Sequence, residues 1–107
     1  MSREAWEENI RRIYGKIADS VIALQDKMGW YGEDRSAVHA QKWQEIREVL
    51  SEAPSSEQMT KYVESIGLDA AQFEAMYGEK KIADALKFGK DLKDRYSVLW
   101  MYYDLLV

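Results

Sequence analysis

The sequence predicts an all-α fold, a single domain of five to six helices over residues 1–107. Apolar residues recur every three or four positions, chain breakers are few, and helix-capping residues bound several segments. The chain has one Pro and six Gly, few for a protein built of short strands and turns. Its length suits one domain, and 47% apolar with 32% charged residues is a globular balance.

The first 28 residues carry the clearest helical period. Seven apolar residues lie three or four positions apart, which places them on one face of a helix. They are Trp6, Ile10, Ile13, Ile17, Val21, Leu24 and Met28. Ser2 suits the N-cap, and Gly29 suits the C-terminal end. Because Gly15 leaves the phase unchanged, we predict one long helix, and whether it bends at Gly15 stays open.

Two aromatic residues, Trp30 and Tyr31, follow Gly29 in a short connector. Exposing both rings on a loop would leave a large apolar surface in water. We therefore expect them to fold back and fill a core. A contact with a partner or ligand is the alternative.

The middle of the chain contains three segments that begin with a capping residue. These are Asp34 before a long helix that Pro54 ends near Ala53, Ser55 with Gln58 before Ser56–Ile66, and Asp69 with Gln72 before Ala70–Tyr77. Gly67 and Gly78 suit the ends of the second and third helices. The inner face of the long helix is predicted to hold Val38, Trp43, Ile46, Val49, Leu50 and Ala53.

From Glu79 onward the apolar spacing is helical again. The stripe comprises Ile82, Leu86, Gly89, Leu92, Tyr96, Leu99, Tyr103 and Leu106. Ser97 is a position where this run can be interrupted and a final helix capped. A strand over residues 96–103 is the alternative, given its aromatic residues, but no second strand is present to pair with it. We therefore predict a helix.

Charge is spread evenly between the two halves of the chain. The net charge is -4, and residues 1–53 and 54–107 each sum to -2. The nearest approach to a basic patch is Lys87, Lys90, Lys93 and Arg95, with Asp91 and Asp94 interleaved. A nucleic-acid-binding protein concentrates Lys and Arg on one face. We interpret the run as a solvated helix face and expect no nucleic-acid partner.

Residues suited to catalysis or ligand binding are scarce. Without Cys there is no disulfide, thiolate zinc site or thiol nucleophile. The one histidine, His39, has no second imidazole or carboxylate three or four residues away. Gly78 with Lys80 and Lys81 lacks the other residues of a phosphate loop, so we interpret it as a helix end and start. We predict no catalytic, cofactor-binding or metal-binding residue.

No segment is typical of a membrane or secreted protein. The longest apolar run, Val98–Tyr103, has six residues, where a span needs about 20. No positively charged and then apolar leader opens the sequence. The expectation is a cytoplasmic protein with no membrane partner.

That same run is apolar on every side of a helix. Such a helix is buried all round or covered by another chain, and Trp and Tyr are common interface anchors. We predict an interaction surface here and in the connector, with ordinary core packing as the alternative. Its residues are Trp30, Tyr31, Trp100, Met101, Tyr102 and Tyr103.

Three segments, Ile22–Tyr31, Lys42–Ile46 and Lys90–Trp100, resemble the carboxy-terminal helical region of bacterial sn-glycerol-1-phosphate dehydrogenases. These enzymes belong to the dehydroquinate synthase-like, iron-containing alcohol dehydrogenase group. The likeness covers nearly the whole chain, and Asp91–Leu99 is its most suggestive part. Members are two-domain enzymes that reduce dihydroxyacetone phosphate, with NAD(P) on an α/β domain and a divalent metal held by an Asp and two His.

No cofactor loop or metal-ligand motif of that family maps onto this sequence. The resemblance therefore implies a non-catalytic helical subdomain or fragment of an oxidoreductase, serving packing or assembly around an active site it does not contain. Its partner would be the missing dinucleotide-binding domain or a second copy in a homo-oligomer. The alternative is a stand-alone helical interaction module that self-associates or binds a partner through its aromatic C-terminal helix.

Overall fold

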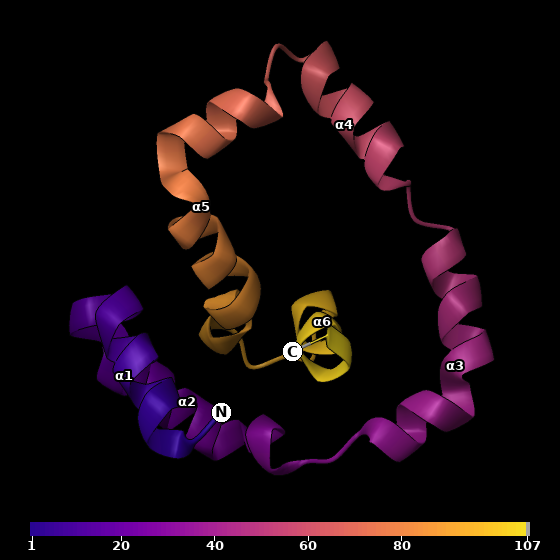
Figure 1. Cartoon of the computed structure of the whole chain (residues 1–107). Helices are drawn as coiled ribbons and strands as arrows, with labels where there is room; N and C mark the ends of the chain where they lie inside the picture. The colour runs from indigo at the N-terminus through magenta and orange to yellow at the C-terminus, as the bar shows by residue number, and fades with distance from the viewer. Residues whose placement is uncertain (107) are drawn as a thin grey trace. The chain divides into compact units, whose positions relative to one another are not determined.

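The computed structural model describes residues 1–106, and every regular element in that range is helical (Figure 1). The elements, with 3-10 turns marked η, are α1 (Arg3–Tyr14), η1 (Gly15–Ile17), α2 (Ala18–Met28), η2 (Trp30–Gly32), α3 (Ser36–Ser51), α4 (Ser56–Ser65), α5 (Ala70–Phe88), η3 (Gly89–Leu92) and α6 (Val98–Leu106). The all-α prediction is confirmed, and α6 forms where a strand was the alternative.

The chain divides into two compact units, each described by itself below. Unit 1 consists of Met1–Asp34 and the chain from Ala83 onward, and unit 2 consists of Arg35–Ile82. The assignment of residues 1–107 to one domain stays a prediction. Among the described residues, no helix has both the length and the apolar character needed to cross a membrane.

The prediction of one long N-terminal helix is wrong, because the chain reverses at Gly15. Gly15 has φ 53° and ψ -117°, a conformation that a residue with a Cβ rarely adopts. The reversal lays α1 and α2 side by side (Figure 1). Arg3 pairs with Asp26 through two hydrogen bonds, the longer 3.0 Å, although 23 residues would span about 34 Å in a straight helix. Of the predicted stripe, Trp6, Ile10 and Val21 are buried in the core of this helical hairpin, whereas Ile17 at the turn is 53% exposed.

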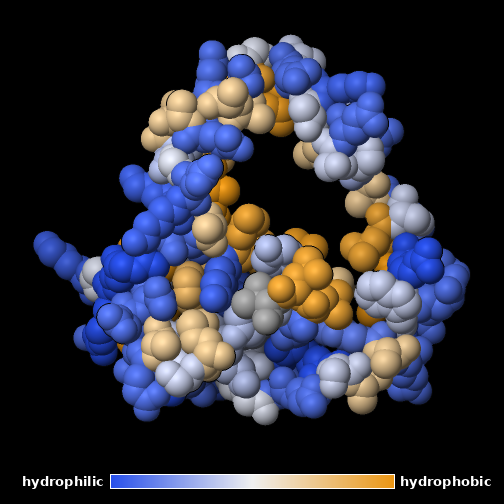
Figure 2. Space-filling view, viewed as in Figure 1, coloured by the Kyte–Doolittle hydropathy of each residue, from blue (hydrophilic) through white to orange (hydrophobic). Residues whose placement is uncertain are grey.

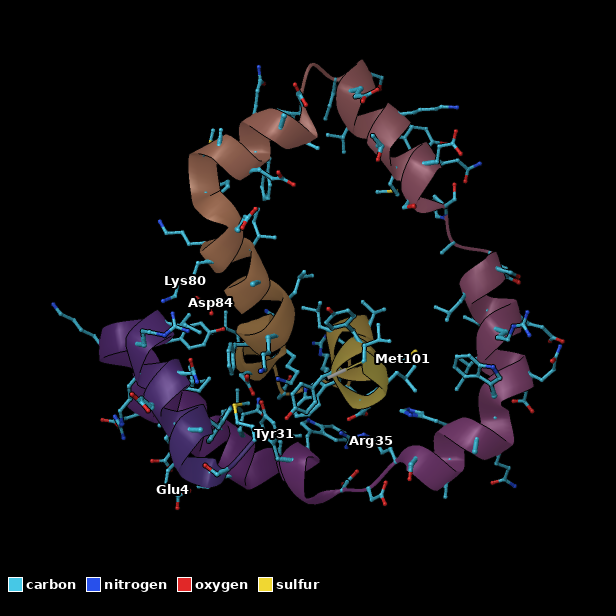
Figure 3. All side chains as sticks on the ribbon, in the orientation of Figure 1. Glu4, Tyr31, Arg35, Lys80, Asp84 and Met101 are labelled. Carbon is cyan, nitrogen blue, oxygen red and sulfur yellow. The ribbon has the colours of Figure 1, made fainter. Side chains whose placement is uncertain are left out.

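Unit 1 has a core between the hairpin and the chain after Ala83. Its buried apolar side chains are Trp6, Ile10, Ala18, Val21, Ile22, Phe88 and Trp100. The Tyr14 hydroxyl donates a 2.7 Å hydrogen bond to the carbonyl of Phe88. Arg12 makes two 2.8 Å hydrogen bonds to Asp84 on the face of α5 that Figure 3 shows turned toward α1. These contacts join segments more than 70 residues apart.

The apolar stripe predicted from Ile82 to Leu106 is interrupted rather than continuous. The α-helix ends at Phe88, η3 follows, and residues 93–97 are not helical. Leu86, before this break, and Leu92, at its end, are both more than 40% exposed, so the stripe is not a continuous buried face. The Ser97 carbonyl accepts from the backbone N–H groups of Trp100 and Met101, so the predicted interruption at Ser97 is confirmed.

Local capping in unit 2 follows the sequence closely. Ser55 and Gln58 form the predicted capping box, with bonds of 3.0 and 3.1 Å. Asp69 accepts from the backbone of Ala71 at 2.9 Å. Gly78 has φ 80° and ψ 156°, so it breaks α5 into two helical stretches. The cap predicted at Asp34 is wrong by one position, because the N-cap residue of α3 is Arg35.

Unit 2 has no buried side chain at all. Residues 35–82 are exposed or intermediate throughout, and α3, α4 and α5 lie end to end rather than packing on one another. The inner face predicted for the long helix is wrong as a buried face, because Val38, Trp43, Val49 and Leu50 are 42–68% exposed. Figure 2 shows hydrophobic side chains at the surface among the charged ones. The helices of unit 2 are amphipathic, but no other part of unit 2 covers their apolar faces.

Candidate functional site

The most unusual group of residues lies in unit 1, where a lysine and an aspartate adjacent in sequence are both buried. Lys90 is 1% exposed and Asp91 is 0% exposed. Their interpretation as part of a solvated helix face is therefore wrong. The run Lys87–Arg95 is not one continuous helix, so alternating charges do not share a water-facing side.

Hydrogen bonds from several elements converge on this pair. The Lys90 ammonium donates to the Tyr31 hydroxyl at 2.8 Å and to the Lys87 carbonyl at 2.6 Å, and lies 3.4 Å from Asp91 Oδ2. The Tyr31 hydroxyl donates to Asp91 Oδ1 at 2.7 Å. Gln25 Nε2 on α2 donates to the carbonyls of Asp91 and Lys93 at 2.9 and 3.1 Å. The pair is thus tied to α2 and η2.

Four aromatic rings surround the Lys90 ammonium, and we call them the Lys90 cage. The distances from Nζ to the ring centroids are 4.1 Å for Tyr103, 5.0 Å for Tyr31 and Trp100, and 5.7 Å for Phe88. The rings also contact one another, with centroids 4.8 Å apart for Tyr31 and Trp100. Cation–π attraction is stronger when the cation is desolvated, so the cage offsets part of the cost of burying the ammonium.

Burial shifts the pKa of Lys90 and the pKa of Asp91 in the directions that favour the neutral form of each side chain. Desolvation raises the pKa of the Asp91 carboxyl, opposed by the Tyr31 hydrogen bond and the Lys90 charge. Desolvation also lowers the pKa of the Lys90 ammonium, opposed by Asp91. The pKa of Tyr31 is raised by desolvation and by the Asp91 carboxylate, so its hydroxyl remains a proton donor. Burial likewise raises the pKa of Tyr14 to about 12.

Buried, hydrogen-bonded groups with shifted pKa values also occur at catalytic sites. At a catalytic site, however, such groups are accessible to substrate. The exposure of Lys90 and Asp91 is so low that a substrate reaches neither group without displacing the aromatic rings. The contacts instead hold residues 88–93 against α2, η2 and α6. We interpret the cluster as a structural clamp of unit 1.

The six residues predicted as an interaction surface have different environments in unit 1. Trp100 is fully buried, so its side chain is core and not surface. Tyr31 is 36% exposed and packs on Trp6, with ring centroids 5.1 Å apart, which confirms that it folds back onto the core. Trp30, Met101 and Tyr103 are half-buried, and Tyr102 is 37% exposed. That these residues bind a partner stays a prediction.

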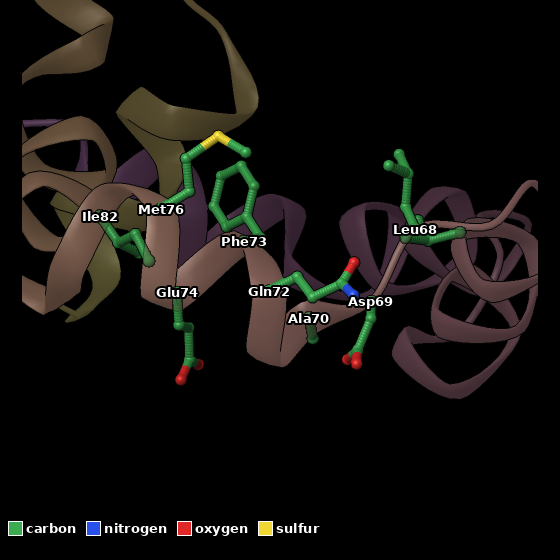
Figure 4. A pocket seen from close by; sticks show the side chains of 9 residues that line it. Leu68, Asp69, Ala70, Gln72, Phe73, Glu74, Met76 and Ile82 are labelled. Carbon is green, nitrogen blue, oxygen red and sulfur yellow. The ribbon is translucent and has the colours of Figure 1, made fainter.

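A second candidate site is an apolar groove in unit 2, which we call the α4–α5 groove. It has a volume of about 500 Å³ and is lined mainly by apolar side chains, Val63, Leu68, Phe73, Met76 and Ile82. Figure 4 shows Phe73 and Met76 side by side, with the carboxylates of Asp69 and Glu74 projecting away from them. This groove has the volume and the mainly apolar lining of a ligand-binding site. Such a site accepts an apolar group that is flanked by polar ones.

The segment that forms this groove is acidic overall. Residues 48–82, which end at the lining residue Ile82, contain seven acidic residues and three basic ones, Lys61, Lys80 and Lys81, a net charge of -4. Lys61 lies 3.6 Å from Glu57. The division of the chain into two halves conceals this asymmetry, because it cuts through the acidic segment, while residues 1–47 and 83–107 each have equal numbers of acidic and basic residues. A sliding count of charge along the sequence would have found it.

Ligands for a metal do not cluster in the part of the chain that is described. Within residues 1–106 no group of three or more His, Asp and Glu side chains is placed to hold an ion. His39 lies on α3, half-buried. The lysines after Gly78 continue the helix, which agrees with the interpretation of Gly78 as a helix end and start.

Comparisons with protein-family models, with curated proteins and with solved structures find no match to this chain. The resemblance to glycerol-1-phosphate dehydrogenases therefore stays a prediction.

Proposed function

We propose that this chain is a non-catalytic helical module that acts by binding another polypeptide, and that residues 35–82 make the contact. One observation carries the proposal. None of these residues is buried, while eleven large apolar side chains are exposed, from Trp43 at 42% to Met76 and Ile66 at 73%.

Such a surface is costly for a helix in water. Helices in proteins obtain most of their stability by packing an amphipathic face, and isolated helices shorter than about 12–15 residues are marginal. With 10 residues α4 is below this length, and α3 with 16 residues is only slightly above it. Capping at Ser55 stabilises α4 only locally, by about 1 kcal/mol. A partner that covers the apolar faces would supply the missing packing.

Hydrogen exchange of the purified full chain tests this proposal. The backbone amides of α3 and α4 should exchange fast, and those of α1 and α2 slowly, because only the latter pack around a core. Equal protection of both regions in a monomer would contradict the proposal. A concentration series by sedimentation separates self-association from binding to a different chain.

The dehydrogenase-like alternative has no specific observation in its favour. As a non-catalytic chain it is expected to show no binding of NADH by titration calorimetry. Measurable NADH binding would overturn the assignment of this chain to a non-catalytic role.

A further inference from the structure

We propose that the α4–α5 groove binds an amphipathic helix of a partner polypeptide whose polar face is basic. This inference rests on the proposed function and specifies the chemistry of the partner. It draws on two independent properties of unit 2, the shape and lining of the groove and the sign of the charge around it.

The lining of the groove suits the apolar face of a helix. Phe73 and Met76 are 54% and 73% exposed, and Leu68 is 57% exposed, so a ligand reaches all three. The Phe73 ring also contacts the Tyr77 ring in a tilted arrangement, with ring centroids 4.8 Å apart, so an aromatic pair lies beside the groove. The thioether of Met76 is flexible and adapts to different apolar side chains. Helices recognised in such grooves insert large side chains at positions i, i+3 or i+4, and i+7.

The negative charge of the segment around the α4–α5 groove favours a partner with positive charge. Asp69 and Glu74 border the groove, with their carboxylates directed away from Phe73 and Met76, within a segment (residues 48–82) of net charge -4. The ion pair with Glu57 offsets the positive charge of Lys61. A basic helix meets complementary charge, whereas a nucleic acid or an acidic helix is repelled. A second copy of this chain would bring the same acidic segment to the contact, so a homodimer through this face is disfavoured.

Binding of designed peptides to the full chain tests the inference. The probe is a fluorescent peptide of about 18 residues, about 27 Å long as a helix, with Leu at helical spacing and Lys elsewhere. One control peptide carries Glu in place of every Lys, and another has the Leu and Lys order scrambled. We expect the basic amphipathic peptide to bind at least about tenfold more tightly than either control, with affinity falling as salt is added.

Variants of the chain locate the contact. Met76→Glu should weaken binding by about tenfold or more, and its side chain is too exposed to affect folding. The double variant Asp69→Asn, Glu74→Gln removes two charges but keeps an acceptor for the Ala71 N–H, and should weaken binding about threefold to tenfold. Glu8→Gln, exposed on α1 in unit 1, is the matched control and should leave binding unchanged.

The outcomes separate this inference from the proposed function. Equal binding of the basic and acidic amphipathic peptides, or binding that survives Met76→Glu, would overturn the inference and leave the proposed function standing. No binding of any peptide would also overturn it. If the amides of residues 35–82 were in addition protected in the isolated chain, both would fall.

Discussion

In unit 1 a lysine and an aspartate are buried among aromatic rings, whereas in unit 2 phenylalanine, methionine and isoleucine side chains are in contact with water. Both units are built from amphipathic helices with similar caps. What differs is the long-range packing, because the α1–α2 hairpin folds back on itself and α3 and α4 do not. An apolar stripe thus specifies a helix face, but a core forms only where a second face meets it.

The largest effect that tests this contrast comes from matched tryptophans. Trp100→Ala, at 0% exposure in unit 1, should lower the free energy of unfolding by about 3–5 kcal/mol, because it leaves a cavity and opens the Lys90 cage. Trp43→Ala, at 42% exposure in unit 2, should lower it by less than about 1 kcal/mol. Urea denaturation measures both. Equal losses would show that the two regions are packed alike.

Breaking the buried pair is the next test. Lys90→Met alone should cost about 3 kcal/mol or more, since it leaves the Asp91 carboxylate buried without its cation. The double variant Lys90→Met, Asp91→Leu should recover most of that loss, because apolar residues replace both charges. The exposed Lys93→Met serves as the control and should change stability little. A double variant as unstable as the single one would mean that the clamp depends on its charges.

The pH dependence of stability gives a smaller signal from the same pair. Because burial raises the pKa of Asp91, the folded state binds more protons than the unfolded chain between pH 3.8, the ordinary value, and the folded pKa. The contribution of Asp91 to stability should therefore fall as the pH rises through that window. Asp91→Asn lacks this contribution, so the unfolding free energy of the native chain relative to this variant should decrease with rising pH. An increase would contradict the predicted direction.

The smallest effects on stability are expected from removing the serine N-cap of one helix in each unit. Ser2 accepts from the Ala5 N–H at 3.1 Å, and Ser55 accepts from the Gln58 N–H at the same distance. Ser2→Ala should lower the global free energy of unfolding by about 1 kcal/mol, because α1 is part of the core unit. Ser55→Ala should speed hydrogen exchange in α4 without changing the global value. A global loss from Ser55→Ala would show that α4 unfolds together with unit 1.

Much of the candidate site in unit 1 was beyond reach of the sequence pattern. The charges of both signs that alternate around Lys90 and Asp91 predict a water-facing helix, whereas both residues are buried. Their burial depends on contacts with distant residues. Tyr31 lies 59 residues before Lys90 and 60 before Asp91, and Gln25 lies 66 residues before Asp91. The Tyr31 ring, by contrast, was correctly predicted to fold back, because a large aromatic between two glycines has few other ways to leave water.

By itself the sequence determined the helical class and most helix boundaries, including the caps at Ser2 and Ser55 and the ends at Gly29, Gly67 and Gly78. These depend on hydrogen bonds and backbone angles within a few residues, which local chemistry dictates. Only the tertiary structure decided that the first stripe closes into a hairpin, that Lys90 and Asp91 are buried, and that residues 35–82 lack a core. Those outcomes depend on contacts between distant segments, and periodicity shows which side of a helix is apolar but not what that side meets.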